Sequence, residues 1–231
     1  MDIQIHNSQM QILKYLLLNK SASFSKLAKA SKLSTDHFNY HLGCLMKTDL
    51  VKKHNDCYEL TISGKEFANR MDTEKTIIEK QAKLGVMLII EKEEDGKKYV
   101  LVQKRLKEPY YGFQGFVTGK IAWGENILMT AARELEEETG LTAELEFKYI
   151  IHELVYLKEN GRLLEDKFFF VVNATKPLGE LNSLPSGENR WVLCSEFNQQ
   201  DKLYYDEIEV YDLMKSGKSG FIEKEFLIEE F

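Results

Sequence analysis

Apolar residues in the first third of the chain recur at the three- and four-residue spacing of amphipathic helices. Three such stretches precede residue 50, and their apolar positions are Ile12, Leu13, Leu16 and Leu17; Phe24, Leu27 and Ala28; and Phe38, Leu42 and Leu45. Residues 50–53 and 57–60 then form two short strands around a turn at 54–56, and residues 61–65 open a further helix. The pattern predicts a small domain over residues 1–72, in which three helices precede a two-stranded hairpin.

The rest of the chain mixes strand-like and helix-like stretches, which is typical of an α/β domain. Strands are expected at residues 84–91, 98–104, 145–157, 167–173 and 188–192, the last of these being the final strand. A closing helix is expected at 203–214. Residues 71–82 are charged and lack turn residues, so they are interpreted as a connecting helix or linker. We therefore place a linker at 73–82 and a second domain at 83–231.

The segment 119–141 (GKIAWGENILMTAARELEEETGL) joins a glycine-bounded loop to a helix. The apolar stripe expected to face the core consists of Leu128, Ala131, Ala132 and Leu135. Gly140, just after the last periodic residue, supplies the C-terminal stop. Phosphate groups can be bound at the start of such a helix, where backbone N–H groups are free.

Three glutamates of this helix, Glu134, Glu137 and Glu138, are spaced i, i+3, i+4, so their carboxylates should converge on one face. Because like charges repel, a hard cation is the natural compensation. Mg²⁺ prefers oxygen ligands and keeps several waters that substrate phosphates can replace. The spacing therefore predicts a Mg²⁺ or Mn²⁺ site. A Glu-rich helix face is more often merely solvated, and only the surrounding residues favour the metal site.

Those surrounding residues complete a recognisable pattern. The segment 119–141 fills every fixed position of G-x5-E-x7-R-E-U-x-E-E-x-G-U, where U is aliphatic, and thus resembles the Nudix box. The resemblance implies an α/β/α sandwich with a mixed sheet and hydrolysis of a diphosphate linkage in a nucleotide or nucleoside-diphosphate derivative. The fixed polar and glycine positions of the box are Gly119, Glu125, Arg133, Glu134, Glu137, Glu138 and Gly140.

The same resemblance implies a role for each residue. Glu134, Glu137 and Glu138 would bind the divalent metal, and Glu134 would also serve as the base or orient it. The Gly119 carbonyl is a further candidate ligand. Arg133 and Glu125 would form an ion pair that holds the loop to the helix.

Upstream of the box the sequence departs from the usual W-x-L-P-G-G. Gln114, Val117 and Thr118 replace the tryptophan, the proline and the first glycine, which affects the loop shape and the bound group. The candidate substrate-binding residues are Arg105, Lys120 and Glu188. Arg105 ends a predicted strand ahead of the box, and Glu188 is expected in a loop before a strand beginning at Trp191, where some Nudix enzymes carry an additional catalytic glutamate.

The N-terminal domain resembles winged helix-turn-helix domains through residues 39–42 (NYHL), 49–51 (DLV) and 60–65 (LTISGK). In that fold the third helix enters the major groove of duplex DNA. The candidate DNA-binding residues are Thr35, His37, Asn39, Tyr40, Lys47, Lys52 and Lys53. Tyr40 can equally be a packing residue, and winged helices also serve as dimerisation or protein-docking modules.

Charge is spread unevenly along the 231 residues. Residues 1–72 hold ten basic and seven acidic residues, a net charge of +3, which leaves −9 for the remainder because the whole chain carries −6. This asymmetry is typical of a nucleic-acid-binding module joined to an acidic one. The three cysteines have no metal-binding or disulfide spacing, and no membrane span or secretory signal is visible, so a cytoplasmic protein is expected.

Two interpretations from different classes follow. In the first, the chain is a Mg²⁺-dependent hydrolase, expected as a homodimer, whose winged helix binds double-stranded DNA or regulates the enzyme. In the second, it is a transcriptional regulator whose Nudix domain senses a nucleotide metabolite. The complete box favours retained catalysis, and the two interpretations are compatible.

Overall fold

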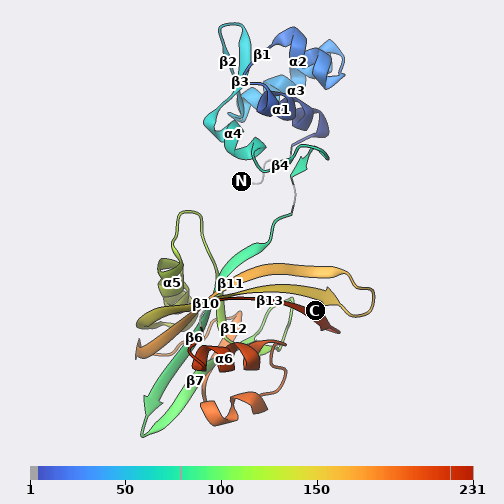
Figure 1. Ribbon diagram of the computed structural model, residues 1–231. Helices are drawn as coiled ribbons and strands as arrows, with labels where there is room; N and C mark the ends of the chain where they lie inside the picture. The colour runs from blue at the N-terminus through green and yellow to red at the C-terminus, as the bar shows by residue number, and fades with distance from the viewer. Residues whose placement is uncertain (1–4, 79, 219, 231) are drawn as a thin grey trace. The chain divides into compact units, whose positions relative to one another are not determined.

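The computed structural model describes residues 5–78, 80–218 and 220–230 (Figure 1). Contacts divide the chain into two compact units, Met1–Lys80 and Gln81–Phe231, called unit 1 and unit 2 below. The linker expected at residues 73–82 therefore spans the boundary between the units.

Unit 1 contains the predicted helices and hairpin. Its elements are α1 (Asn7–Leu18), β1 (Ala22–Ser23), α2 (Phe24–Ser31), α3 (Thr35–Lys47), β2 (Val51–His54), β3 (Cys57–Leu60), α4 (Ile62–Ala68), β4 (Met71–Asp72) and β5 (Ile77–Ile78). Leu13, Leu27 and Phe38, one from each of the first three helices, are fully or almost fully buried in one cluster. The strands β1, β3 and β2 form a small antiparallel sheet, in which Val51 pairs with Leu60.

The segment after α4 does not form the connecting helix that was one of the two interpretations of residues 71–82. Strands β4 and β5 pair as a short antiparallel hairpin, with Met71 opposite Ile78. The Asp72 side chain accepts hydrogen bonds from the backbone N–H groups of Glu74 (2.8 Å) and Lys75 (3.0 Å), which stabilises a turn. An aspartate at the first turn position thus replaces the glycine or proline whose absence led to the helical interpretation.

Unit 2 is a mixed sheet with helices on both faces. Its elements are β6 (Lys83–Glu94), β7 (Lys97–Arg105), β8 (Gln114–Gly115), β9 (Val117–Lys120), α5 (Ile127–Thr139), β10 (Leu141–Leu157), β11 (Leu163–Gly179), β12 (Gly187–Leu193), the 3-10 helix η1 (Cys194–Gln199), α6 (Glu207–Lys215) and β13 (Phe221–Ile228). The main strand order is β12-β7-β6-β11-β10-β13, with β8 beside β7 and β9 beside β6. β6 and β11 are parallel, whereas β10 and β11 are antiparallel.

The central strand β6 shows why this is a three-layer arrangement. Val86 and Leu88 belong to the buried cluster that contains Ala131 of α5, whereas Met87 belongs to the cluster that contains Val210 of α6. Alternate side chains of one strand therefore pack against helices on opposite faces. The predicted α/β/α sandwich with a mixed sheet is confirmed.

The buried face of α5 differs from the predicted apolar stripe. Leu128 and Ala132 are exposed, whereas Thr130, Glu134 and Thr139 are buried beside the expected apolar residues. Polar residues can occupy this face because their hydrogen bonds are satisfied: the Thr139 hydroxyl donates to the Leu135 carbonyl at 2.5 Å. Two of the four predicted core residues, Ala131 and Leu135, are therefore buried as expected, whereas Leu128 and Ala132 are not.

The strand at 188–192 is not the last one. β13 follows α6 and pairs in parallel with β10, where Ile150 lies opposite Phe221. Its alternating exposure is that of an edge strand with one covered face. Among the described residues, no helix is both long and apolar enough to cross a membrane.

Candidate active site

The loop and helix of the box are fixed at both ends. At the start of α5, the Asn126 side chain accepts a hydrogen bond from the Met129 N–H at 2.9 Å. At its end, Gly140 adopts φ 74°, the left-handed conformation that favours glycine. A side chain at Gly140 would also begin 2.5 Å from Asn182 Nδ2. The glutamates of α5 are therefore held on a rigid element.

Arg133 is the centre of the box. Its Nε and Nη2 donate to the two carboxylate oxygens of Glu125 at 2.7 and 2.8 Å, and Nη2 also donates to the Lys120 carbonyl at 3.1 Å. Hydrogen bonds from Arg133 and then Thr130 hold the pKa of Glu125 at about 2, while the same ion pairs raise the pKa of Arg133. Arg133 thus attaches the loop to the helix by bidentate contacts.

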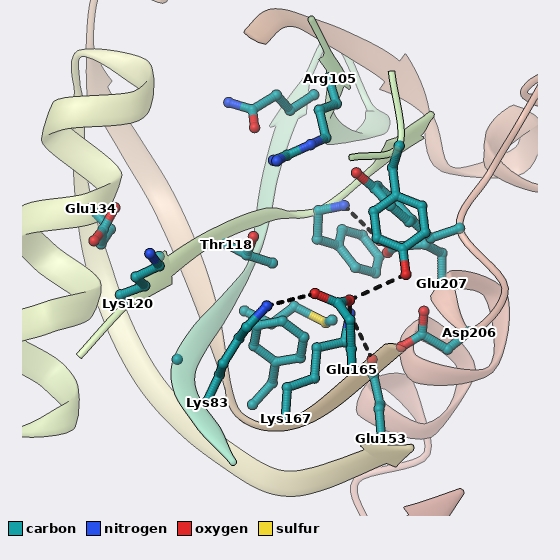
Figure 2. A pocket seen from close by; sticks show the side chains of 18 of the residues that line it. Lys83, Arg105, Thr118, Lys120, Glu134, Glu153, Glu165, Lys167, Asp206 and Glu207 are labelled. Carbon is teal, nitrogen blue, oxygen red and sulfur yellow. Dashed lines mark hydrogen bonds and ion pairs between the residues drawn. The ribbon is translucent and has the colours of Figure 1, made fainter. Parts of the chain in front are cut away.

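The glycine that opens the box is required by close packing. A Cβ at Gly119 would lie 2.0 Å from Cδ of Glu134, so the strand β9 has room for this carboxylate only without a side chain. Glu134 is buried, and Arg133 Nη1 donates to it at 2.8 Å. Figure 2 shows Glu134 on its helix beside the strand that carries Thr118 and Lys120.

The three predicted metal ligands are arranged less closely than the spacing suggested. Glu134 and Glu138 line one cavity, and Glu138 accepts a hydrogen bond from Gln103 at 3.0 Å. Glu137 is outside the cavity lining; its side chain is 60 % exposed and lies 2.9 Å from Arg133 Nη1. Within the described ranges no three His, Cys, Asp or Glu side chains form a group that could hold a metal ion as they stand.

The chemistry of these side chains nevertheless fits a hard cation. The positively charged Nη1 of Arg133 bridges Glu134 and Glu137 at 2.8 and 2.9 Å, so one cationic group already lies between two carboxylates of the helix. Carboxylate oxygens are the ligands that Mg²⁺ prefers. The donor set is suitable, whereas its gathering around an ion would require these side chains to move.

The cavity beside the box has a volume of about 490 Å³, within the size range of small-molecule sites (Figure 2). Strands β6, β7, β9, β10 and β11, helix α5 and the segment 204–207 contribute to its walls. Arg105, Lys107 and Lys120 are basic residues that line it. Arg105 Nε donates to the Pro109 carbonyl at 2.5 Å, which fixes its guanidinium at the wall.

The end of the cavity away from α5 contains a buried charge network. Lys167 Nζ lies 3.1 Å from both Glu153 Oε2 and Glu165 Oε2, and Lys83 Nζ lies 2.9 Å from Glu165 Oε1. Burial alone would lower the pKa of Lys167, but the charges of Glu153 and Glu165 raise it above the ordinary value. The lysine is therefore a fixed cation surrounded by acids.

Two further buried acids, Asp206 and Glu207, adjoin this network at the start of α6 (Figure 2). Burial, together with the neighbouring Glu153, raises the pKa of Asp206 well above the usual range. Burial raises the pKa of Glu207 to about 8, although the backbone N–H of Phe116 donates to its Oε1 at 3.1 Å. A Cβ at Gly115 would lie 1.9 Å from that oxygen, so this glycine also makes room for a carboxylate.

Not every sequence candidate lies at the cavity. Arg105 and Lys120 line it, but Glu188 does not: it is exposed within β12, opposite Lys104, rather than in a loop before the strand. Because β12 begins at Gly187, Glu188 lies inside the strand and not in the loop that was expected before Trp191.

The sequence reasoning missed the acidic end altogether. The residues concerned are Glu153, Glu165, Lys167, Asp206 and Glu207. Charges within long strands of a hairpin and acids in the first turn of a helix are ordinarily solvated or capping groups. The available signal was the adjacent pair at 206–207, directly after two tyrosines.

The candidate DNA-binding residues of unit 1 all lie on its surface. They lie on α3 and in the β2–β3 hairpin, and each is exposed: Thr35, His37, Asn39, Tyr40, Lys47, Lys52 and Lys53. Lys52 Nζ lies 3.2 Å from Glu59 and Lys53 Nζ lies 3.0 Å from Asp56, so both lysines of β2 are paired with carboxylates.

Comparison with known families decides the classification of unit 2. A family model described as "NUDIX domain" matches residues 82–214, more than half of the chain. The chain belongs to the NUDIX family. A second model, described as "Domain of unknown function (DUF7347)", matches residues 4–71, which lie within unit 1. No curated protein matches the sequence.

Solved Nudix structures share the fold. The NUDIX domain of Shewanella oneidensis NrtR, complexed with ADP ribose, is 17% identical with a TM-score of 0.52, over 68% of this chain and 98% of that one. The MutT protein of Bacillus halodurans is 22% identical with a TM-score of 0.54, over 64% of this chain and 93% of that one. At these identities the likeness establishes the Nudix fold.

Proposed function

We propose that the chain is a divalent-metal-dependent Nudix hydrolase that cleaves a diphosphate linkage in a nucleoside-diphosphate derivative. The observation that carries the proposal is the single cavity that Glu134 and Glu138 of the box share with Arg105, Lys107 and Lys120. Acids on a rigid helix suit a cation, and basic side chains in the same cavity suit phosphate oxygens.

Each residue of the box has a task in this proposal. Glu134, Glu137 and Glu138 hold Mg²⁺ or Mn²⁺, which, when bound, neutralises phosphate charge and lowers the pKa of a bound water. Glu134, fixed between Gly119 and Arg133, orients the attacking water or accepts its proton. Arg133 positions Glu134 and Glu137 and keeps the loop closed through Glu125.

The substrate panel follows from this cavity and from the fold relatives. ADP-ribose belongs in it because the NrtR domain of similar fold carries that molecule. Nucleoside triphosphates, nucleotide sugars, dinucleoside polyphosphates and coenzymes complete it, because each contains a diphosphate linkage. The changed sequence at 114–118 makes the choice among them an experimental question.

Glu138→Gln tests the proposal. The variant keeps the shape of the side chain but removes a carboxylate of the cavity, so the rate of Mg²⁺-dependent phosphate or nucleotide release should fall by roughly 10²-fold or more. Glu225→Gln, an exposed change on β13 outside the cavity lining, is the matched control and should retain the wild-type rate. Equal rates for wild type and Glu138→Gln, or activity that survives chelation of divalent metal, would contradict the proposal.

A second proposal concerns unit 1: it binds duplex DNA through α3 and the wing, so that the chain acts as a regulator responsive to its nucleotide. The supporting observation is that all seven candidate residues are exposed while the apolar side of α3, with Phe38, Leu42 and Leu45, is buried. Selection from random duplex DNA with the full chain, with and without the nucleotides of the panel, tests it.

A further inference from the structure

Glu138 differs from the other two glutamates of the box in its hydrogen-bond partner. Glu134 and Glu137 both contact the charged guanidinium of Arg133, at 2.8 and 2.9 Å. The Oε2 of Glu138 instead accepts from a neutral side-chain amide, the Nε2 of Gln103, at 3.0 Å. A cation that binds the first two glutamates must compete with Arg133, whereas a neutral amide leaves the negative charge of Glu138 in place.

Gln103 is seated for this contact by the neighbouring strand. It lies in β7 and pairs directly with Asn189 of β12. A Cβ at Gly187, also in β12, would lie 2.8 Å from Cδ and 2.9 Å from Nε2 of Gln103, so the amide occupies space that only a glycine leaves free. Close packing against Gly187 therefore restricts the amide to few orientations.

The cross-strand partner of Gln103 holds the main chain of the same glutamate. Asn189 is buried, and its Nδ2 donates to the Glu138 carbonyl at 2.6 Å and to the Asn182 carbonyl at 2.8 Å. Glu138 lies in the last turn of α5, where carbonyl groups lack partners within the helix. Two paired residues of adjacent strands thus fix Glu138 at its main chain and at its side chain.

This arrangement suits a ligand that is already in place before a cation binds. A carboxylate held through Oε2 keeps Oε1 for the cation, and Glu138 and Gln103 line the same cavity. Residues that hydrogen-bond metal ligands orient them, and their loss weakens metal binding. A purely structural role explains Gln103 less well, because water in the cavity would satisfy both side chains without their direct contact.

We propose that Gln103 is a positioning residue, which fixes Oε2 of Glu138 and thereby presents Oε1 to a divalent cation. The inference rests on the proposed function in one respect, that Glu138 binds the metal. Gln103 then acts on the cation only through Glu138, and Asn189 supports the same carboxylate from the main chain.

The experiment measures binding of Mn²⁺ alone to the full chain, without a nucleotide. Electron paramagnetic resonance of free Mn²⁺ gives the affinity in a titration. Gln103→Met nearly keeps the length of the side chain and removes its N–H donor, so the affinity should fall by about 10- to 100-fold, the range for a residue that supports a metal ligand. Gln199→Met, the same change at an exposed glutamine outside the cavity lining, should retain the wild-type affinity.

A double-mutant cycle shows whether Gln103 acts through Glu138. Glu138→Ala removes the group that Gln103 contacts and should itself weaken Mn²⁺ binding. In that background Gln103→Met should change the affinity by less than about threefold, because no carboxylate remains to be positioned. A residue that only supports the fold would lower the affinity by the same factor in both backgrounds.

The outcomes separate this inference from the proposed function. Hydrolysis and Mn²⁺ affinity that depend on Glu138 but not on Gln103 overturn the inference and leave the proposed function intact. Equal losses from Gln103→Met in both backgrounds overturn it as well. A loss that disappears in the Glu138→Ala background supports the inference even if the nucleotide panel shows no hydrolysis.

If Gln103→Met fails to fold by circular dichroism, nuclear magnetic resonance of the wild-type protein decides. Addition of Mg²⁺ should shift the side-chain amide signals of Gln103 and leave those of Gln199 unchanged. Gln103 signals that stay unchanged at saturating Mg²⁺ overturn the inference, and so does a wild-type protein that binds no Mn²⁺.

Discussion

Gly119 and Gly115 each allow a buried carboxylate to lie against a strand, and Gly119 can be tested directly. In Gly119→Ala the new methyl group would begin 2.0 Å from Cδ of Glu134, so either the strand or the glutamate must move. Overpacking of this kind destabilises by about 1–3 kcal/mol. We expect unit 2 to lose stability of that order in denaturant unfolding, and the hydrolysis rate to fall at least about tenfold.

A matched glycine in the other unit provides the control. Gly43 lies inside α3 with nothing within 4 Å of an added Cβ, so Gly43→Ala should be neutral or stabilise unit 1 by up to about 1 kcal/mol. Its hydrolysis rate should equal that of the wild type. Wild-type activity and stability in Gly119→Ala would show that Glu134 does not need its present position.

The sequence predicted some residues of the site and not others, for a physical reason. Arg133 and Glu125 could be predicted because both lie in one loop–helix segment, where spacing fixes geometry, and the structure places them 2.7 Å apart. Glu153, Lys167 and Glu207 lie on three separate elements, so only the fold brings them together. Their burial is a tertiary property that no local pattern reports.

At the scale of elements, period and turn chemistry located helices α1–α6, the β2–β3 hairpin and the long strands β6, β7, β10, β11 and β12, but not the short strands β1, β4, β5, β8 and β9 or the edge strand β13. Two of the wrong predictions concern polar residues that form a turn or lie in a buried position. Asp72 formed a turn in a segment without glycine or proline, and Glu134 occupied the inward face of α5. β13 was overlooked because an alternating strand at 221–228 follows a helix that had been expected to close the fold.

Strand β13 contacts a histidine of β10 whose pKa is shifted. His152 of β10 lies with Nδ1 2.6 Å from Glu223 of β13 and Nε2 2.9 Å from Asp166 of β11, so one imidazole links three strands. Burial alone would lower its pKa, but the hydrogen bonds to Glu223 and Asp166 outweigh burial and raise the pKa above 6.5. A raised pKa means stabilisation that is fully present below about 6.5 and lost as pH rises through the folded-state value.

His152→Gln tests this link. The neutral amide cannot form the charged pair, so the variant should unfold a few degrees below the wild type near pH 6, and the difference should narrow as pH rises. Tryptophan fluorescence can follow unit 2, because both tryptophans, Trp123 and Trp191, lie in it. His54→Gln, an exposed change in unit 1, should leave this transition unaltered. A difference that widened toward alkaline pH would contradict the assignment.

At the scale of the whole molecule, the chain combines an acidic Nudix unit with a basic helical one. The net charge of −9 beyond residue 72 opposes non-specific attachment to DNA, while the +3 before it favours phosphate contacts. A specific site on DNA should therefore stand out against random duplex. The hairpin β4–β5 is the last secondary structure of unit 1, which ends at Lys80. All seven candidate DNA-binding residues therefore belong to unit 1.

The corresponding prediction is that Lys52→Ala with Lys53→Ala weakens DNA binding on every sequence alike. Both lysines are exposed on β2, and each is paired with a carboxylate at 3.0–3.2 Å. Such surface pairs are weak enough to exchange for phosphate. Log K should fall with log salt by about 0.9 per phosphate contacted, so losing up to two contacts flattens the slope by about 0.9 to 1.8. Fluorescence anisotropy over a salt series measures both quantities.

Asn39→Ala provides the contrast, because Asn39 lies on the exposed face of α3 and is uncharged. It should alter which sequences are selected and leave the salt slope unchanged, since base contacts specify while phosphate contacts position. If the two units are coupled, adding the nucleotide that the Nudix unit binds should change the affinity for DNA. By thermodynamic reciprocity, DNA should then change the affinity for the nucleotide by the same factor. No duplex retained at low salt, and no motif enriched from random DNA, would assign unit 1 to dimerisation or protein docking instead.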